Sequence, residues 1–337
     1  MTSTTSRKSG LSSIWNFIKI VLALGLVAYV LSRAEPSKLV AALRGASTVW
    51  LFTSAVLYLL LTVLKALQYY VFMREKLTYL QVLNVIIWQN AVSNFFLAGA
   101  GIATYITLTR LEHEVKVSRS VTTFLLTKMG DLIAIWLVLI LSSSLVWSKI
   151  GVLHTAVILL ILGIGFVILF FFLTILFRQR FISLFGDILN WAKGSGGRWI
   201  EQGVNDLQGL ADMNQNKMLT TFGLLAFYSL IYLAVSILFI YANLAIFHVQ
   251  PDIPSVMFVS VLMQLVSYFP VGVFGGLGIT ETSALYFWSF FEIPQEILAP
   301  ALIGIRVIFY LFNLIPLIYL PVYSAFRKPK EQAQNEP

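Results

Sequence analysis

Long apolar runs separated by short polar segments dominate the chain. Six of them are continuous and long enough to cross the roughly 30 Å hydrocarbon core of a bilayer as a helix. They cover residues 14–31, 50–72, 121–147, 153–177, 219–247 and 297–326. The first run exceeds the roughly 7–15 apolar residues of a signal-peptide core, so we expect it to be retained as a helix. The pattern predicts an all-α polytopic membrane protein with one transmembrane domain, residues 1–330.

Two further apolar segments, residues 80–108 and 255–291, are broken by glycines and share a short motif. We interpret each as a re-entrant pair of half-helices joined by a glycine-rich turn at membrane depth. Such a turn is tolerated only where the backbone faces protein or a wet cavity. Paired broken segments in the two halves of a chain are typical of a transporter's binding site. The motif comprises Val92, Ser93, Phe95, Gly99, Gly101 and Ile102 in the first segment and Val266, Ser267, Phe269, Gly276, Gly278 and Ile279 in the second.

The distribution of lysine and arginine agrees with this arrangement. Let the N-terminus be cytoplasmic, and let both pairs return to the side from which they enter. Fifteen Lys and Arg residues then lie inside and four outside, as the positive-inside rule requires; the outer four are Arg33, Lys38, Arg44 and Lys149. The first pair enters from the cytoplasm and the second from outside. We therefore expect an inverted repeat of residues 50–150 and 219–326, with both termini cytoplasmic.

Composition narrows the classes of function. Hydrophobic residues make up 58% of the chain and charged residues 11%, against about 25% charged residues in a soluble protein. We therefore expect no soluble catalytic domain. Cysteine is absent and the three histidines lie far apart, so we expect no disulfide, metal site or cofactor. The chain has no GxxxxGK[ST] nucleotide-binding loop. The expected partners are membrane lipids, not nucleic acid.

Two segments lie outside the apolar runs. Residues 178–217 contain an amphipathic stretch followed by a GSGG linker, and we expect an interfacial helix on the inner leaflet; a partner-binding site is the alternative. Residues 331–337 are polar and are predicted to be a disordered tail.

Five ionisable residues lie well inside apolar runs: Lys65, Lys128, Asp131, Glu281 and Arg306. Each costs about 2.5–3.5 kcal/mol at the centre of a membrane helix, so each is a functional candidate by default. Lys65 is the exception, because it is close to the polar end of its run. Arg74, just after that run, is nine positions away, roughly 13 Å along a helix. The side chain of Lys65 can extend toward that end, and we expect it to be structural.

The other four charges have natural partners. Lys128 and Asp131 are three residues apart and share one helix face, so a local ion pair is the alternative to a functional role. Arg306 lies ten residues into the last run and its natural partner is Glu281. Lys128 and Arg306 occupy corresponding places in the two halves, each on the helix after a broken pair. Spacing alone leaves open whether Glu281–Arg306 is structural or responds to substrate.

The starts of the second half-helices are candidate anion sites, since free backbone N–H groups and partial positive charge gather at a helix N-terminus. We expect one half-helix to start after Gly278, with Thr280 and Glu281, and the other after Gly101, with Thr104. Two alternatives stay open: Glu281 acts only as a helix cap, or the glycines serve only close helix packing.

The second broken segment carries a specific motif. Pro270 followed by Gly275, Gly276, Gly278, Thr280 and Glu281 is similar to the P-x-GGxGxxE block of the lysylphosphatidylglycerol synthase transmembrane-region family, with extra residues between the proline and the glycines. Arg306 matches a basic residue on that family's following helix. The resemblance covers residues 11–327.

The first broken segment resembles the family less closely. Asn94 with Gly99 and Gly101, and Lys128-x-x-Asp131 further on, resemble the family's N-x-x-PG-x-x-GE block and its E-R-x-x-D motif. The chain has Leu97, Ile102 and Tyr105 where the family usually has proline, glutamate and often a basic residue. Glu281 is therefore the sole acidic candidate on the broken helices.

The resemblance implies a flippase-like protein of a bacterial or archaeal cytoplasmic membrane, similar to the membrane domain of multiple peptide resistance factors. In bifunctional relatives a separate soluble domain makes an aminoacylated lipid. We see no match to that domain and expect no synthase activity. A homo-oligomer and a separately encoded lipid-modifying enzyme stay open as partners.

Our leading hypothesis is a lipid flippase or transporter that moves a phospholipid or lipid-linked head group through a central cavity with an anion-binding centre. One alternative is an ion-coupled transporter of a small soluble anion, which also suits inverted broken helices. Another is a membrane-embedded transferase acting on lipid-linked substrates. That reaction would need Asp131 beside Glu281 as an acid/base pair, and we expect no enzyme activity.

Overall fold

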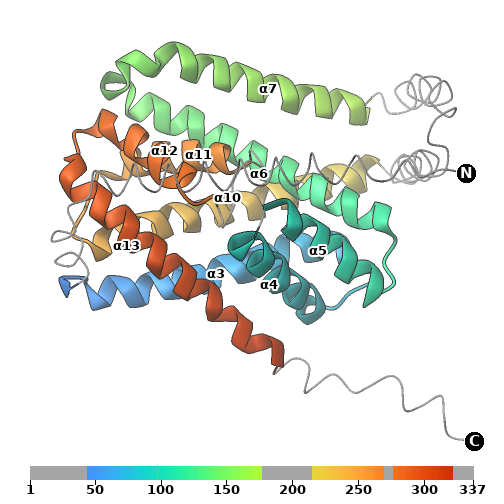
Figure 1. Ribbon diagram of the computed structural model, residues 1–337. Helices are drawn as coiled ribbons and strands as arrows, with labels where there is room; N and C mark the ends of the chain where they lie inside the picture. The colour runs from blue at the N-terminus through green and yellow to red at the C-terminus, as the bar shows by residue number, and fades with distance from the viewer. Residues whose placement is uncertain (1–43, 97, 177–214, 269–275, 322–337) are drawn as a thin grey trace, which may run out of the picture.

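The structure, a computed structural model, describes residues 44–96, 98–176, 215–268 and 276–321, and every regular element in these ranges is a helix (Figure 1). Five of the helices are long and apolar enough to cross a membrane. These are α3 (Thr48–Met73), α6 (Val117–Leu145), α7 (His154–Leu176), α10 (Gln215–Ile246) and α13 (Gln295–Leu314). The prediction of an all-α polytopic membrane protein is confirmed. The predicted first span, the segment 178–214 and the tail lie outside the described residues.

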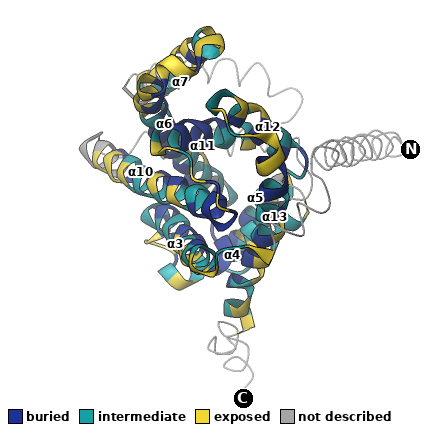
Figure 2. Cartoon of the chain, turned by 90° about the vertical axis from the view of Figure 1, so that its left-hand side faces the viewer, coloured by how far each residue is buried: buried dark blue, intermediate teal, exposed yellow. Residues whose placement is uncertain are grey.

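The bundle presents apolar side chains to its surroundings, as a protein with lipid as its solvent must. Helix α7 shows this most clearly, because it lies at the edge of the bundle against α6 (Figures 1 and 2). Leu162 and Phe166 of α7 are exposed. On the inner face of α7, Gly165 lies close to Trp136, whose indole N–H donates a 2.8 Å hydrogen bond to the carbonyl of Ile161.

Two pairs of shorter helices fold back on themselves. Helices α4 (Tyr79–Phe95) and α5 (Ala98–Leu111) form the first pair; α11 (Ile253–Ser267) and α12 (Ile279–Trp288) form the second. They contain 17, 14, 15 and 10 residues. At about 1.5 Å per residue none of them reaches across a roughly 30 Å core. This agrees with half-helices, while their insertion from opposite faces of a bilayer stays a prediction. Three short 3₁₀ segments, η1 (Trp147–Lys149), η2 (Gly151–Leu153) and η3 (Ser289–Phe291), lie in the connections, and η4 (Pro316–Ile318) follows α13.

Contacts between loops define two opposite ends of the bundle. At one end the backbone N–H of Ser47 bonds the carbonyl of Ile246 at 2.9 Å, and Lys149 pairs with Asp252 at 3.0 Å. At the other end Arg119, at the start of α6, pairs with Glu75, before α4, at 2.8 Å. The first pair therefore starts and finishes at one end and the second pair starts at the other (Figure 1). This agrees with an inverted repeat, which stays a prediction.

The two glycine-containing breaks have different structures. In the second, Gly276 and Gly278 adopt φ of +81° and +83°, and α12 begins at Ile279 as predicted. In the first, α5 already begins at Ala98, and the hydroxyl of Thr104 bonds the carbonyl of Ala100 inside the helix. The prediction that this half-helix starts after Gly101 was wrong. The helix continues through the glycines because they let it lie close to α4: a Cβ on Gly101 would be 2.7 Å from the carbonyl oxygen of Gln89.

Candidate functional site

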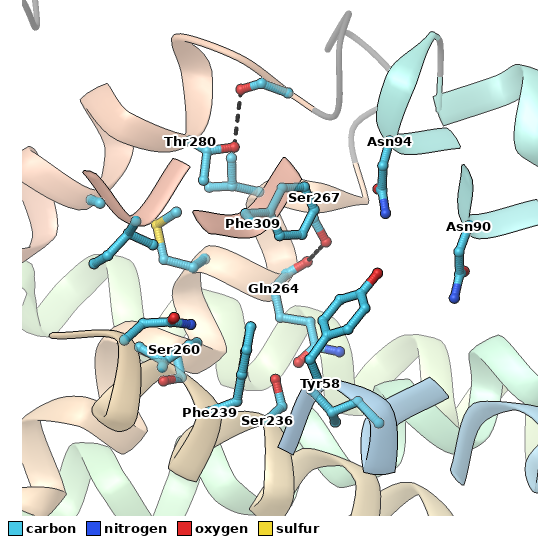
Figure 3. Close-up of a pocket in the computed structure, with 18 of the residues that line it drawn as sticks. Tyr58, Asn90, Asn94, Ser236, Phe239, Ser260, Gln264, Ser267, Thr280 and Phe309 are labelled. Atoms are coloured by element: carbon cyan, nitrogen blue, oxygen red, sulfur yellow. Dashed lines mark hydrogen bonds between the residues drawn. The ribbon is translucent and has the colours of Figure 1, made fainter. Parts of the chain in front are cut away.

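A cavity of about 800 Å³ lies inside the bundle, between the ends of the two hairpins. The first hairpin contributes Ser93 and Asn94 at the end of α4. The second contributes Ser267 at the end of α11 and Thr280 at the start of α12. Figure 3 shows Asn94 and Thr280 on opposite sides of this space, with Gln264 between them. Side chains of α3, α6, α10 and α13 form the remaining walls.

The five charged residues predicted to lie at membrane depth all line this one cavity: Lys65, Lys128, Asp131, Glu281 and Arg306. They come from four helices, α3, α6, α12 and α13. Since each charge costs free energy in a membrane interior, their convergence on one cavity makes them candidates for a common role. The sequence predicted the residues; the structure shows that they share a site.

Asp131 is the centre of the first charge cluster. Its carboxylate accepts hydrogen bonds from Lys65 at 2.7 Å, from Gln68 at 3.2 Å and from Ser229 at 3.2 Å. Lys128 is further away, with its ammonium 3.7 Å from the same carboxylate. The predicted local pair with Lys128 is therefore present, but it is the weaker of the two ion pairs of Asp131.

The expectation that Lys65 extends toward the end of its helix was wrong. Its side chain is 13% exposed, bonds Asp131 and lies 4.6 Å from the ring centroid of Tyr232. The carboxylate of Asp131 and the ring of Tyr232 interact with the ammonium in place of water. Lys65 therefore belongs to the site, where sequence reasoning did not place it.

Glu281 and Arg306 form the second charge cluster, and the predicted pairing between them is confirmed. Arg306 Nε lies 3.3 Å from Glu281 Oε1, and both side chains are largely buried. The guanidinium also lies 5.3 Å and 5.1 Å from the ring centroids of Phe309 and Tyr310, at distances typical of cation–π contacts.

Glu281 also caps α12, because its Oε2 accepts a 2.6 Å hydrogen bond from the backbone N–H of Gly278. The carboxylate thus uses both oxygens, one on the helix N-terminus and one on Arg306. An incoming anion would find the α12 N-terminus already occupied by this carboxylate. The cationic side chains, rather than the helix dipole alone, are therefore the groups with which an anion would interact.

A network of uncharged polar side chains fixes the end of the first hairpin. The amide of Asn94 donates a 2.6 Å hydrogen bond to the side-chain oxygen of Asn313 on α13. The hydroxyl of Tyr58 on α3 donates to the same oxygen at 2.6 Å. Asn94 thus has a positioning role in addition to lining the cavity.

The glycines predicted as site residues have varied positions. Gly276 lines the cavity, while Gly278 lies beside it as the N-cap of α12. Gly99 and Gly101 are not among the residues that line the cavity, and Gly101 serves helix packing. Gly275 lies outside the described residues.

Sequence reasoning missed Tyr268, which lines the cavity. It also missed three residues that bond cavity-lining side chains: Gln68, Ser229 and Asn313. Gln68 and Lys65 are three residues apart on α3, a spacing that places two side chains on one helix face and could have identified them. Ser229, Tyr268 and Asn313 carry no comparable signal, because isolated polar residues occur throughout the apolar runs.

Five membrane-length apolar helices around a cavity lined by ion-paired side chains define a multi-pass membrane protein with charged groups in its interior. The chain matches the model of the lysylphosphatidylglycerol synthase TM region over residues 16–316, and it belongs to that family. The match covers both hairpins and all five charged residues of the cavity. A search of curated proteins and a search of solved structures found no match to the chain.

Proposed function

We propose that the protein is a transporter that moves a lipid head group between the leaflets of a cytoplasmic membrane through the central cavity. The observation that carries the proposal is the convergence of Lys65, Lys128, Asp131, Glu281 and Arg306 on one cavity of about 800 Å³ between two oppositely directed hairpins. Membership of the family supports it, since this membrane domain is often linked to lipid transport.

The chemistry of the cavity suits a phosphate-containing head group. Lys128 and Arg306 offer N–H donors and positive charge to phosphate oxygens, and such charge-assisted hydrogen bonds are the strong ones. Asparagine, glutamine and serine side chains in the walls can bond hydroxyl groups of the head group. The acyl tails would stay in the lipid. The proposed step breaks no covalent bond, so the protein acts as a transporter and not as an enzyme.

The test is a leaflet-translocation assay in liposomes that contain the purified full chain and a panel of labelled phospholipids and polyprenyl lipids. We expect translocation by the wild type and a loss of about tenfold or more in Arg306→Ala and Glu281→Gln, since removing one partner of a buried charge pair typically costs a few kcal/mol. The matched control is Lys149→Gln, which removes one member of an exposed ion pair at the end of the bundle and should leave the rate unchanged.

Other outcomes would contradict the proposal. Unchanged rates in Arg306→Ala and Glu281→Gln would refute the assignment of the site. Uptake of a soluble anion without translocation of any lipid would favour an anion transporter. Chemical change of the recovered lipid would favour a transferase.

A further inference from the structure

Among the described residues that line the cavity, cations outnumber anions by one. Lys65, Lys128 and Arg306 face Asp131 and Glu281. Inside a membrane protein an uncompensated charge is costly because the surrounding dielectric is low. A ligand that carries one negative charge would make this part of the cavity neutral.

The contact distances identify Lys128 as the excess cation. Lys65 lies 2.7 Å from Asp131 and Arg306 lies 3.3 Å from Glu281, whereas Lys128 lies 3.7 Å from an aspartate that already bonds Lys65. The side chain of Lys128 is 36% exposed, against 13% for Lys65 and 11% for Arg306. Its ammonium therefore keeps donors available to a ligand in the cavity.

Two buried hydroxyl groups of the cavity wall, those of Tyr268 and Ser260, can also donate to a bound anion, and Tyr268 lies beside Lys128. The ring of Tyr268 lies with its centroid 4.8 Å from the Lys128 ammonium. The buried hydroxyls of Tyr268 and Ser260 have no hydrogen-bond partner within the part of the chain that the structure describes. Buried polar groups are normally satisfied, and the oxygens of a bound anion can accept from an O–H group.

We infer that the preferred substrate is a lipid with a single net negative charge, such as a phosphodiester with an uncharged head group, and that Lys128 and Tyr268 hold its phosphate. This inference rests on the proposed function and specifies the substrate class of the same site. A zwitterionic lipid would leave the excess charge in place. An aminoacylated, net cationic lipid would increase it, and a dianionic phosphomonoester would reverse it.

Binding of short-chain lipids tests the inference separately from transport. We would titrate the purified full chain in neutral detergent with dioctanoyl forms of phosphatidylglycerol, phosphatidylcholine, phosphatidic acid and lysyl-phosphatidylglycerol, and measure Kd by calorimetry. We expect phosphatidylglycerol to bind about tenfold or more tightly than phosphatidylcholine, the effect of roughly one favourable charge pair. Lysyl-phosphatidylglycerol should bind most weakly.

Three variants assign the effect to residues. Lys128→Gln should abolish the preference for phosphatidylglycerol, and Lys128→Arg should keep it because the charge remains. Tyr268→Phe keeps the ring and removes the hydroxyl, so it should weaken phosphatidylglycerol binding severalfold even if Lys128→Gln does not fold. Lys149→Gln, the matched control, should bind all four lipids like the wild type.

The outcomes separate this inference from the proposed function. Equal affinity for phosphatidylglycerol and phosphatidylcholine, or an unchanged preference in Lys128→Gln, would overturn the inference. Translocation that is indifferent to head-group charge would also overturn it and leave the transport proposal standing. Selective binding of phosphatidylglycerol without translocation of any lipid would support the inference and contradict the proposed function.

Discussion

At the scale of single residues, the carboxylate of Asp131 joins three helices, because it accepts hydrogen bonds from Lys65 and Gln68 on α3 and from Ser229 on α10. Asp131→Asn keeps the shape of the side chain but leaves Lys65 buried without a counter-charge. We expect it to lower stability by about 3 kcal/mol, as breaking a buried ion pair does. Thermal unfolding of the purified protein in detergent measures the effect.

The control for Asp131→Asn is Asp252→Asn. Asp252 pairs with Lys149 at 3.0 Å, but both side chains are about half exposed, so water screens the pair and the loss should stay below about 1 kcal/mol. The double variant Lys65→Met with Asp131→Asn removes both charges and should recover part of the stability. Equal destabilisation by Asp131→Asn and Asp252→Asn would contradict this account.

The same residues show how far hydropathy alone identifies a site. An ionisable residue in an apolar run is visible in the sequence because it is costly there. Four of the five cavity charges were therefore predicted as site residues, and Lys65 was noticed but expected to be structural. The pairing of Glu281 with Arg306 was predicted because Arg306 lies too deep in its apolar run to reach water easily. The partner of Lys65 was missed because only the distance from Lys65 to the end of its own helix was considered. Asp131 lies on another helix, 66 residues further along the chain.

At the scale of elements, the fit of α5 against α4 depends on Gly101. A Cβ there would lie 2.7 Å from both the Gln89 carbonyl oxygen and the Ser93 Cβ, whereas a Cβ on Gly99 would meet nothing within 4 Å. Gly101→Ala should cost about 1–3 kcal/mol because the backbone of α4 must move. Gly99→Ala, the same change two residues away, should be neutral or stabilising by up to about 1 kcal/mol. Thermal unfolding of the two variants compares them, and similar losses in both would contradict this view of the hairpin.

The sequence predicts the existence of these elements better than their internal geometry. Spans such as α3 and α10 follow from the length of an apolar run, which depends on composition alone. The two glycine motifs look alike in the sequence, yet Gly101 serves close packing and Gly278 adopts a positive φ. Glycine suits both purposes for the same reason, its missing Cβ, so a pattern of glycines cannot distinguish them.

At the scale of the whole molecule, the count of Lys and Arg predicted hairpins that enter from opposite ends, but it could not predict the cavity between them. The cavity depends on side chains that are distant in sequence, such as Asn94 with Asn313 and Ser54 with Asn243. Contacts of that kind leave no mark on local hydropathy. The presence of a central polar site could be inferred from the buried charges; its walls could not.

The orientation of the hairpins in a real membrane can be tested directly, because the chain contains no cysteine and an introduced one can be labelled alone. Lys76→Cys and Lys116→Cys flank α4 and α5; Gln250→Cys and Gln295→Cys flank α11 and α12. We expect an impermeant maleimide to label the first two positions only from the cytoplasmic face and the last two only from outside, as the charge distribution requires. Labelling of Lys76→Cys and Lys116→Cys from opposite faces would make that segment a simple span and contradict the inverted repeat. If all four cysteines were labelled from the faces opposite to those expected, the inverted repeat would still hold. The repeat requires only that each hairpin returns to the face from which it started and that the two hairpins start from opposite faces.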